Sequence, residues 1–429
     1  MKLLTRKFSF TSNQILDIAG LGCVLGYSLL AFYSRQHEPS IAVFFVLIAW
    51  VSLLTFGVYA YFQHEALPVA RLIFWAVLFR CCGLLGMPLF EDDFYRYLWD
   101  AYRFAEAGTP YGLAPEHFFT DSNVPPVFQR ILDHINNPDI PTIYGPTAQY
   151  AFLAGYLLTP GDVLSLQLIF VLFDMLLIGL LLSLAPARSV LLYAWSPLVI
   201  KEIAFTAHPD GLGVCLLIAA LVFQQRERLD GAAVCLALSV GAKVFALLLV
   251  PFILARASLR HWLIFLAVIL LLYLPFWLQG SADREALTVF AREWEFNAAL
   301  FGVLTIWLSS LNAKLVLGVA FLGFLAWYYL RYRQQTSIPR GDWIYGIFLF
   351  VAPAINAWYF LWLLPFAVIY PSCWAWTASL AVLLSYITGL NLGDFNLLPH
   401  DHPVWVRPVE FGLIAMALCY DIYRNRRAV

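Results

Sequence analysis

Three consecutive acidic residues, Glu91, Asp92 and Asp93, follow directly after a long apolar run. Carboxylates held side by side repel one another, so ionisation of all three at once is disfavoured. Carboxyl groups with perturbed ionisation are candidates for acid and base chemistry. The same residues are also compatible with a plain helix start, where acids interact favourably with the helix dipole. The acidic run is therefore the first place to look for a reaction centre.

The residues that follow the acids have helical spacing. Asp93, Arg96 and Asp100 stand at i, i+3 and i+7 and so share one helix face, with Tyr97 close to it. A Gly-Thr-Pro segment then ends the pattern, because glycine and proline stop helices. A helix of this kind is typical of a segment lying along a membrane surface. The sequence predicts such a helix here and a second short one at Val127–Ile135.

A second polar cluster interrupts the apolar part of the chain. It contains Lys201 and Glu202, followed by His208 and Asp210. Ionisable groups at membrane depth are costly and are functional candidates by default. His208 and Asp210 could line a substrate site, or the cluster could be a polar loop with internal ion pairs. Lys243, flanked by apolar residues, needs an anion such as a lipid phosphate, unless it extends to a headgroup.

Two later polar segments offer weaker candidates. Arg292 and Asn297 lie beside Trp294 in a loop, and arginine suits bidentate contact with phosphate. A solvated loop with ion pairs is the alternative. His400 and His402 are two residues apart in a proline-flanked loop, which is poor spacing for a metal site. We therefore expect no metal and no cofactor, and the sequence gives no indication of a divalent cation.

The composition indicates an integral membrane protein. The chain has 429 residues, of which 62% are hydrophobic and only 12% charged, about half the charged fraction of a soluble domain. Apolar runs recur along its whole length. We predict an all-α polytopic bundle of about 11 to 13 transmembrane helices, forming one domain over residues 1–429. Some runs are short, which predicts half-helices. The net charge of −1 gives no basic face for nucleic acid.

Lysine and arginine predict the orientation in the membrane, because they mark cytoplasmic loops. Both ends of the chain carry them: Lys2, Arg6 and Lys7 at the N-terminus, and Arg424, Arg426 and Arg427 at the C-terminus. Both termini are thus predicted to be cytoplasmic, with a retained first span from Ile15. Three spans then place the long loop at residues 91–146 outside. A bacterial inner membrane is the expected location.

The loop motif resembles that of a known enzyme group. Asp93-x-x-Arg96-Tyr97 followed by Gly108 is similar to the first-loop motif of GT-C fold glycosyltransferases, including the lipid A aminoarabinose transferases. The longer string from Asp92 to Asp100, with Gly-x-Pro-Tyr after it, resembles bacterial polyprenol-phosphate-mannose-dependent mannosyltransferases. Trp294-Glu-Phe-Asn and Trp358-Tyr-x-x-Trp-x-x-Pro also resemble parts of that group. One departure is that the acidic loop follows the third span, whereas in most GT-C enzymes it follows the first.

The resemblance implies a GT-C-like bundle and an inverting transfer of a hexose, with mannose as the sugar. The donor would be a polyprenyl-phosphate sugar, and the acceptor a hydroxyl of a lipid, glycan or protein. Asp93 would be the general base, with Asp92 as the second choice. The residues expected to bind substrate or donor are Arg96, Tyr97, Asp100, Tyr144, His208, Asp210, Lys243, Arg292 and Asn297.

Two other functions compete with this interpretation. A transporter or flippase for a lipid-linked molecule would also contain broken helices, but it often shows internal repeats, and none is found. A structural subunit would not need paired aspartates in an outer loop. The gathering of the acids in a loop, rather than through the spans, favours surface chemistry and therefore the transferase.

Overall fold

The computed structural model describes residues 11–36, 39–280 and 284–427. These residues fold into helices joined by loops, and among them only one isolated bridge, between Phe296 and Ala354, has β geometry. The prediction of an all-α protein is thereby confirmed. The basic residues of the extreme N-terminus (Lys2, Arg6 and Lys7) lie outside the described part of the chain.

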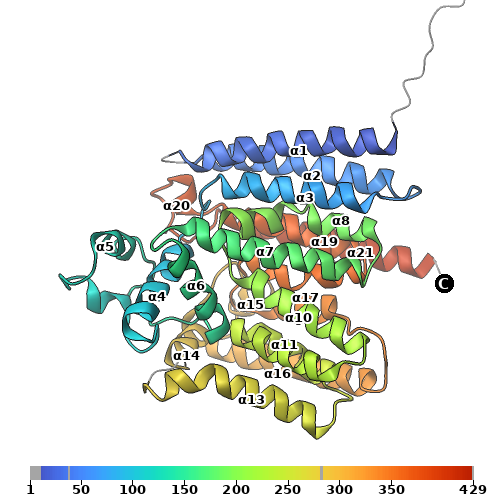
Figure 1. Ribbon diagram of the computed structural model, residues 1–429. Coiled ribbons are helices and arrows are strands. Elements are labelled where there is room, and N and C mark those ends of the chain that lie inside the picture. Colours follow the sequence, from blue (N-terminus) through green and yellow to red (C-terminus); the bar gives the residue numbers. More distant parts are fainter. Residues whose placement is uncertain (1–10, 37–38, 281–283, 428–429) are drawn as a thin grey trace, which may run out of the picture.

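Five helices are long and apolar enough to cross a bilayer, which confirms a polytopic membrane protein. They are α1 (Ser12–Ser34), α2 (Ile41–Tyr61), α7 (Val163–Leu182), α13 (Leu259–Trp277) and α16 (Ser310–Tyr332). Figure 1 shows α1, α2 and α3 side by side along one flank of the bundle and α13 on the opposite flank.

The other helices are shorter, as the broken apolar runs predict. They are α3 (Val69–Leu84), α4 (Asp93–Ala107), η1 (Pro115–Phe118), α5 (Pro126–Leu132), α6 (Pro146–Leu158), α8 (Ala187–Ala194), α9 (Pro197–Val199), η2 (Ile200–Phe205), α10 (Asp210–Gln225), α11 (Leu229–Ala242), η3 (Val244–Leu249), α12 (Val250–Ile253), α14 (Arg284–Glu293), α15 (Leu300–Leu304), α17 (Gly341–Val351), η4 (Ala357–Trp362), α18 (Leu364–Ile369), α19 (Cys373–Ala381), η5 (Val382–Tyr386), α20 (Gly389–Leu392) and α21 (Val406–Arg427). Several are half-helices, so the figure of 11 to 13 crossings stays a prediction.

The segment that carries the second polar cluster is a broken span. The helices α9 and η2, the latter a π-helical turn, are bent by 117° relative to α10. The break falls at residues 206–209, where Ala207 adopts a left-handed conformation with φ of 60°. The His208 N–H donates to the Glu202 carbonyl at 2.9 Å, so the break does not leave this backbone group unpaired. Breaks of this kind are tolerated at membrane depth only where protein or a cavity surrounds them.

The predicted amphipathic helix after the acids is present as α4. It begins at Asp93 and is stopped by Gly108, which takes the left-handed C-cap conformation with φ of 72°. Arg96, Tyr97 and Asp100 are all buried on it. The second short helix, α5, ends at Leu132, three residues before the predicted end. Figure 1 shows α4, α5 and α6 grouped together at one end of the bundle.

A buried ion pair joins two helices in the middle of the bundle. Arg80 on α3 donates to Asp174 on α7 at 2.7 Å, and both side chains are buried. The Tyr193 hydroxyl donates to the other Asp174 oxygen at 2.8 Å. Arg80 and Asp174, which stand isolated within their apolar runs in the sequence, therefore pair with each other in the fold.

Replacing Arg80 by Leu is expected to destabilise the fold by about 3–5 kcal/mol, because Asp174 would stay buried without its partner. The midpoint of thermal unfolding in detergent measures this loss. The double variant Arg80→Leu with Asp174→Leu should recover most of it. Equal loss in the single and double variants would show that the ion pair itself contributes the stability.

Candidate functional site

The acids at the start of α4 are held by two neighbouring side chains. The Asn136 amide donates to Asp92 at 2.6 Å and to Asp93 at 3.1 Å. The Tyr144 hydroxyl donates to the other Asp93 oxygen at 3.3 Å. Burial raises the pKa of Asp93, although the bonds from Asn136 and Tyr144 and the charge of Lys243 oppose the rise. Asp93 is thus an oriented carboxylate with a raised pKa.

Burial also raises the pKa of the two preceding acids. For Asp92 the charge of Asp93 adds to the effect of burial. The pKa of Glu91 lies well above its usual value, and the nearby charge of Lys201 opposes this rise only in part. The three groups differ in surroundings, and Asp93 alone of them accepts hydrogen bonds at both carboxylate oxygens, from Asn136 and Tyr144 on the loop before α6.

Arg96 holds the loop that carries Asn136. Its guanidinium donates to the carbonyls of Asn136, Asn137 and Ile140 at 3.3, 2.9 and 2.8 Å. These contacts use both terminal nitrogens on main-chain oxygens. The geometry therefore makes Arg96 a positioning residue that orients Asp93 through Asn136, rather than a direct partner of Asp93.

A line of aromatic and imidazole groups connects Asp93 to the broken span. The Tyr144 hydroxyl lies 3.4 Å from the Tyr97 hydroxyl, which lies 3.0 Å from His208 Nδ1. The His208 ring stacks on Trp358 with a centroid distance of 4.1 Å. Tyr97 and His208 are both fully buried. The structure thus brings the predicted residues Asp93, Tyr97, Tyr144 and His208 together.

The floor of this region is a buried ion pair on η2. Lys201 Nζ lies 3.2 Å from Glu202, which also accepts from the Tyr386 hydroxyl at 2.8 Å. Lys201 also stands over the Tyr386 ring at 3.8 Å. His208 Nε2 is 3.5 Å from Glu202. The second polar cluster is therefore one network with internal pairing, continuous with the acids.

Asp210 and Lys243 form the other pair. Lys243 Nζ lies 2.7 Å from Asp210, which also accepts from the Trp362 indole at 2.7 Å. The ammonium group lies 4.5 Å from the centroid of the Tyr359 ring, and 20% of the Lys243 side chain is exposed. Asp210 is buried and its second oxygen lacks a partner. Lys243 is thus a fixed cation that is still open to a ligand.

Two glycines bring the acids and Lys243 close together. A Cβ atom at Gly145 would lie only 2.3 Å from the carbonyl oxygen of Gly241. Gly145 follows Tyr144 directly, and Gly241 lies two residues before Lys243. Because neither glycine has a side chain, the start of α6 can pack on the end of α11. This contact sets Lys243 beside the loop that orients Asp93.

Asp100 binds α4 to α6. It accepts hydrogen bonds from the Thr142 hydroxyl and, at 2.9 Å, from the Gln149 amide. Burial raises its pKa from 3.8 to about 6, although Arg96 opposes this. These hydrogen bonds join α4 to α6, so the contacts of Asp100 stabilise the scaffold.

Replacing Asp100 by Asn should stabilise the protein more at pH 7.5 than at pH 4.5. A carboxyl with a raised folded-state pKa gives its full stability below the unfolded pKa and loses it as the pH rises through about 6. The loss amounts to about 3 kcal/mol for such a shift. Asn accepts the same bonds without this loss. Unfolding midpoints at both pH values test this, with Asp139→Asn as the exposed control; an equal gain at both values would contradict it.

Two predicted residues lie apart from these clusters. Asn297 donates to both oxygens of the buried Glu410 carboxylate at 3.0 and 3.1 Å. Its neighbour Phe296 bridges to Ala354, in the segment that leads to Trp358. Arg292 is exposed at the end of α14, and its carbonyl accepts from Lys314. Asn297 therefore anchors the α21 helix, whereas Arg292 makes no contact with the acids within the part of the chain that the structure describes.

The three acids are the one group within the described residues whose spacing could hold a metal ion. One oxygen from each of Glu91, Asp92 and Asp93 lies within 4.8 Å of the others. His402 contacts the Ile387 carbonyl and the Phe296 ring, and His400 is exposed. The negative charge of these three carboxylates can be offset by a bound cation, by a proton that they share, or by the nearby charge of Lys201.

Strained backbone conformations occur directly before the acids and directly before His208. Residues with a side chain rarely adopt positive φ, and such strain clusters at functional sites. Phe90, directly before the acids, has φ of 60°, as has Ala207, directly before His208. Asn297 has φ of 48°. The acids and His208 are therefore both presented from strained turns.

Some residues of the site carry no signal in the sequence. Asn136 lies in a polar loop 44 residues from Asp92, and only the fold shows that it bonds both aspartates. Tyr386 comes from the opposite end of the chain. Trp358 and Trp362 stand in the aromatic segment already noted for its resemblance, but their stacking on His208 and bonding to Asp210 are visible only in three dimensions.

Comparison with known proteins gives one match. A family model described as alpha-(1->6)-mannopyranosyltransferase, N-terminal domain, matches residues 39–258, just over half of the chain. The matched part contains the acids, the broken span and Lys243. No curated protein and no solved structure matches the chain.

Proposed function

The chain belongs to the alpha-(1->6)-mannopyranosyltransferase family, and from that premise we propose that it moves mannose from a polyprenyl-phosphate carrier to an acceptor hydroxyl. Mannosyl transfer follows from the family. The carrier, the inversion at the sugar and the role of Asp93 as general base are the proposal. The observation that carries it is the oriented, half-buried Asp93 beside the cation Lys243 at one end of a membrane-spanning bundle.

Asp93 is suited to accept the proton of a hydroxyl. Asn136 and Tyr144 fix its carboxylate, so no reorganisation is needed during the reaction. Burial raises its pKa and so makes it a stronger base once ionised. Asp92 shares only the Asn136 contact, which makes it the second choice.

Lys243 is suited to the phosphate of the donor. The bond that breaks leaves negative charge on the phosphate oxygen, and a fixed cation stabilises that charge. Asp210, which is itself held by the Trp362 indole, fixes the ammonium group, and the Tyr359 ring lies below it, while part of the side chain remains exposed. Arg292, on an outer loop, is a second candidate for the phosphate.

The bond changes define the stereochemistry. The acceptor oxygen gives its proton to Asp93 and attacks C1 of the mannose, while the C1–O bond to the phosphate breaks and polyprenyl phosphate leaves. A single displacement inverts C1. The family name specifies an α-(1→6) bond, so inversion requires a β-linked donor, and the attacking group is the primary 6-hydroxyl of an acceptor sugar.

Tyr97, Tyr144 and His208 would form the wall of the sugar site. Their buried polar groups and the Trp358 ring beneath His208 provide hydrogen bonding and an apolar face, as sugars require. Arg96, Asp100 and Asn297 support the site from behind, since their side chains are bound to other parts of the fold. We place this site on the extracytoplasmic face of a bacterial inner membrane, with both termini in the cytoplasm.

The proposal is tested with purified protein in vesicles. The assay supplies radiolabelled β-mannosyl polyprenyl phosphate and an α-mannoside acceptor and measures the extended glycan. A mannoside product with an α-(1→6) bond, formed equally with and without a chelator, is expected. Movement of the lipid across the bilayer without any product would favour the transporter. Transfer that stops in the chelator would instead place a required cation at Glu91, Asp92 and Asp93.

A further inference from the structure

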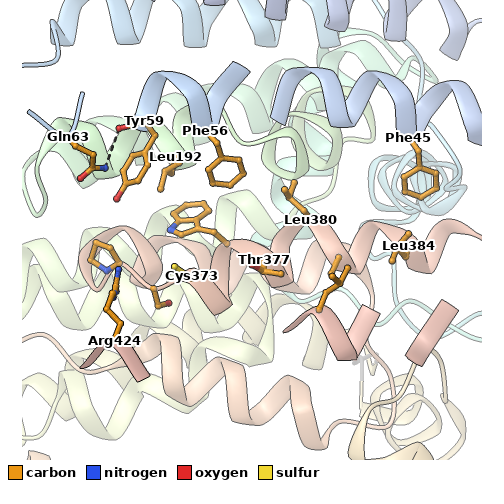
Figure 2. Close-up of a pocket in the computed structure, with 15 residues that line it drawn as sticks. Phe45, Phe56, Tyr59, Gln63, Leu192, Cys373, Thr377, Leu380, Leu384 and Arg424 are labelled. Carbon is orange, nitrogen blue, oxygen red and sulfur yellow. Dashed lines mark hydrogen bonds between the residues drawn. The ribbon is translucent and has the colours of Figure 1, made fainter. Parts of the chain in front are cut away.

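A long apolar groove lies on the flank of the bundle away from α13. It is bounded by α2 on one side and by α19, η5 and α21 on the other, and has a volume of about 690 Å³. Figure 2 shows its side chains in two facing rows, with Phe45 and Leu384 at one end and Gln63 and Arg424 at the other. Most of its lining is apolar, so its occupant must be largely hydrocarbon.

The groove is as long as a lipid chain. Phe45 and Gln63 are 18 residues apart along and just beyond α2, which corresponds to about 27 Å of helix. The Phe45 end is near the acids, because the ring of the adjacent Phe44 packs on Phe90, which directly precedes Glu91, with a centroid distance of 5.2 Å. The Gln63 end is therefore the one opposite to the acids. A lipid with its headgroup at Gln63 would lie with its chains toward the bilayer centre.

The end opposite to the acids contains unpaired polar groups. The buried Trp376 indole N–H and the Ser372 hydroxyl have no partner, and both residues line the groove with Arg424. A second cavity of about 320 Å³ shares Ser372 and Arg424 and adds Asp421. One Asp421 oxygen accepts from the Trp374 N–H at 2.9 Å, while the other has no hydrogen bond and lies 3.5 Å from Arg424.

We propose that this groove binds a phospholipid whose headgroup carries both a phosphate and a primary ammonium, as phosphatidylethanolamine does. Ser372, Trp376 and Arg424 are donors for the phosphate oxygens. Asp421 accepts from the ammonium. One acyl chain lies along the groove between α2 and α19. Each unpaired polar atom then has a partner of the opposite kind.

The charges argue against two other occupants. A purely anionic headgroup would satisfy the donors but would be repelled by Asp421, and it would leave one oxygen of that carboxylate without a hydrogen bond. The sugar donor must bring its phosphate to Lys243 and Asp93, whereas the donors of this groove lie at the opposite end of α2. The inference rests on the chain spanning a bilayer and not on the transfer reaction.

Delipidated protein in detergent tests the proposal through the shift of its unfolding midpoint on adding lipid. Phosphatidylethanolamine should raise the midpoint more than phosphatidylglycerol or phosphatidylcholine. Arg424→Gln should remove most of the shift for all headgroups, and Asp421→Asn only the preference for phosphatidylethanolamine. Thr377→Trp, which fills the groove, should remove the shift entirely. Arg333→Gln, an exposed arginine elsewhere, is the control.

The outcomes separate the alternatives. Native mass spectrometry should find one tightly held phosphatidylethanolamine in the unaltered protein and none in Thr377→Trp. Equal shifts with all three lipids, unchanged by the variants, would overturn the proposal in favour of ordinary boundary lipid. A preference for phosphatidylglycerol that Asp421→Asn leaves unchanged would also overturn it, as would displacement of the bound lipid by polyprenyl phosphate.

Discussion

Replacing Asp93 by Asn should reduce mannosyl transfer by a factor of about 100 to 10,000, the range that a positioned general base contributes. Asn has the same size and can still accept from Tyr144, so the site should keep its shape. Only the capacity to take a proton is lost. The turnover of labelled donor into glycan measures the effect, and the affinity for donor should stay within a few-fold of its original value.

The pH profile supplies an independent measurement of the same residue. The base acts only when ionised, and burial raises the pKa of Asp93 above the usual value of an aspartate. The rate should therefore fall as the pH drops through this raised pKa, at a higher pH than an exposed aspartate would give. Asp133→Asn, an exposed change in the same loop, should leave rate and profile unchanged. Loss of activity in Asp92→Asn together with full activity in Asp93→Asn would transfer the base assignment to Asp92.

Helices that are determined by residue spacing and hydropathy could be predicted from the sequence. The helix beginning at Asp93 and stopped by Gly108 follows from spacing and from glycine at the C-cap, and the long apolar helices follow from hydropathy. The short helices are harder, because a half-helix such as α11 is stabilised by packing against its neighbours rather than by its own length. The break in the second polar cluster shows this, since its bend of 117° falls at residues 206–209, where Ala207 takes a left-handed conformation that is unusual for alanine.

The site could be predicted in its residue types but not in its pairings. Arg96 shares a helix face with Asp93, which favours a role in orienting Asp93 or in contacting phosphate, but only the fold shows that its guanidinium donates to three carbonyls of a distant loop. Asn297 stands beside aromatic residues in a polar loop, and only the fold shows that its amide is bound to Glu410. The hydrogen-bond partner of each side chain depends on which chain segments meet in space, and this cannot be derived from one sequence.

Lys243 illustrates what the sequence can predict about a partner and what only the fold can add. A lone lysine between apolar residues implies an anionic partner, and the sequence left a lipid phosphate and a membrane headgroup as alternatives. The fold adds a third partner, Asp210, and places the ammonium group beside the acids through the Gly145–Gly241 contact. The pairing with Asp210 does not exclude a phosphate, because an ammonium group has three donors and Lys243 remains partly exposed.

Replacing Lys243 by Gln should lower the rate of transfer by a factor of about 100 to 1,000, which is the usual effect of removing one group that stabilises developing charge. The change also leaves Asp210 buried without its cation, so some activity could be lost through the fold alone. Arg260→Gln, which removes a cation from the exposed ion pair with Asp230, serves as the control and should keep full activity.

The double variant Lys243→Gln with Asp210→Asn separates the two effects. It removes the unpaired carboxylate, so the unfolding midpoint should return toward that of the unaltered protein. The rate should not recover if Lys243 acts on the phosphate, because no cation then faces the leaving group. Recovery of both would mean that Lys243 only neutralises Asp210. A donor with a better leaving group needs less stabilisation, so it should lose less rate in the double variant than polyprenyl phosphate does, whereas a structural defect would slow both donors equally.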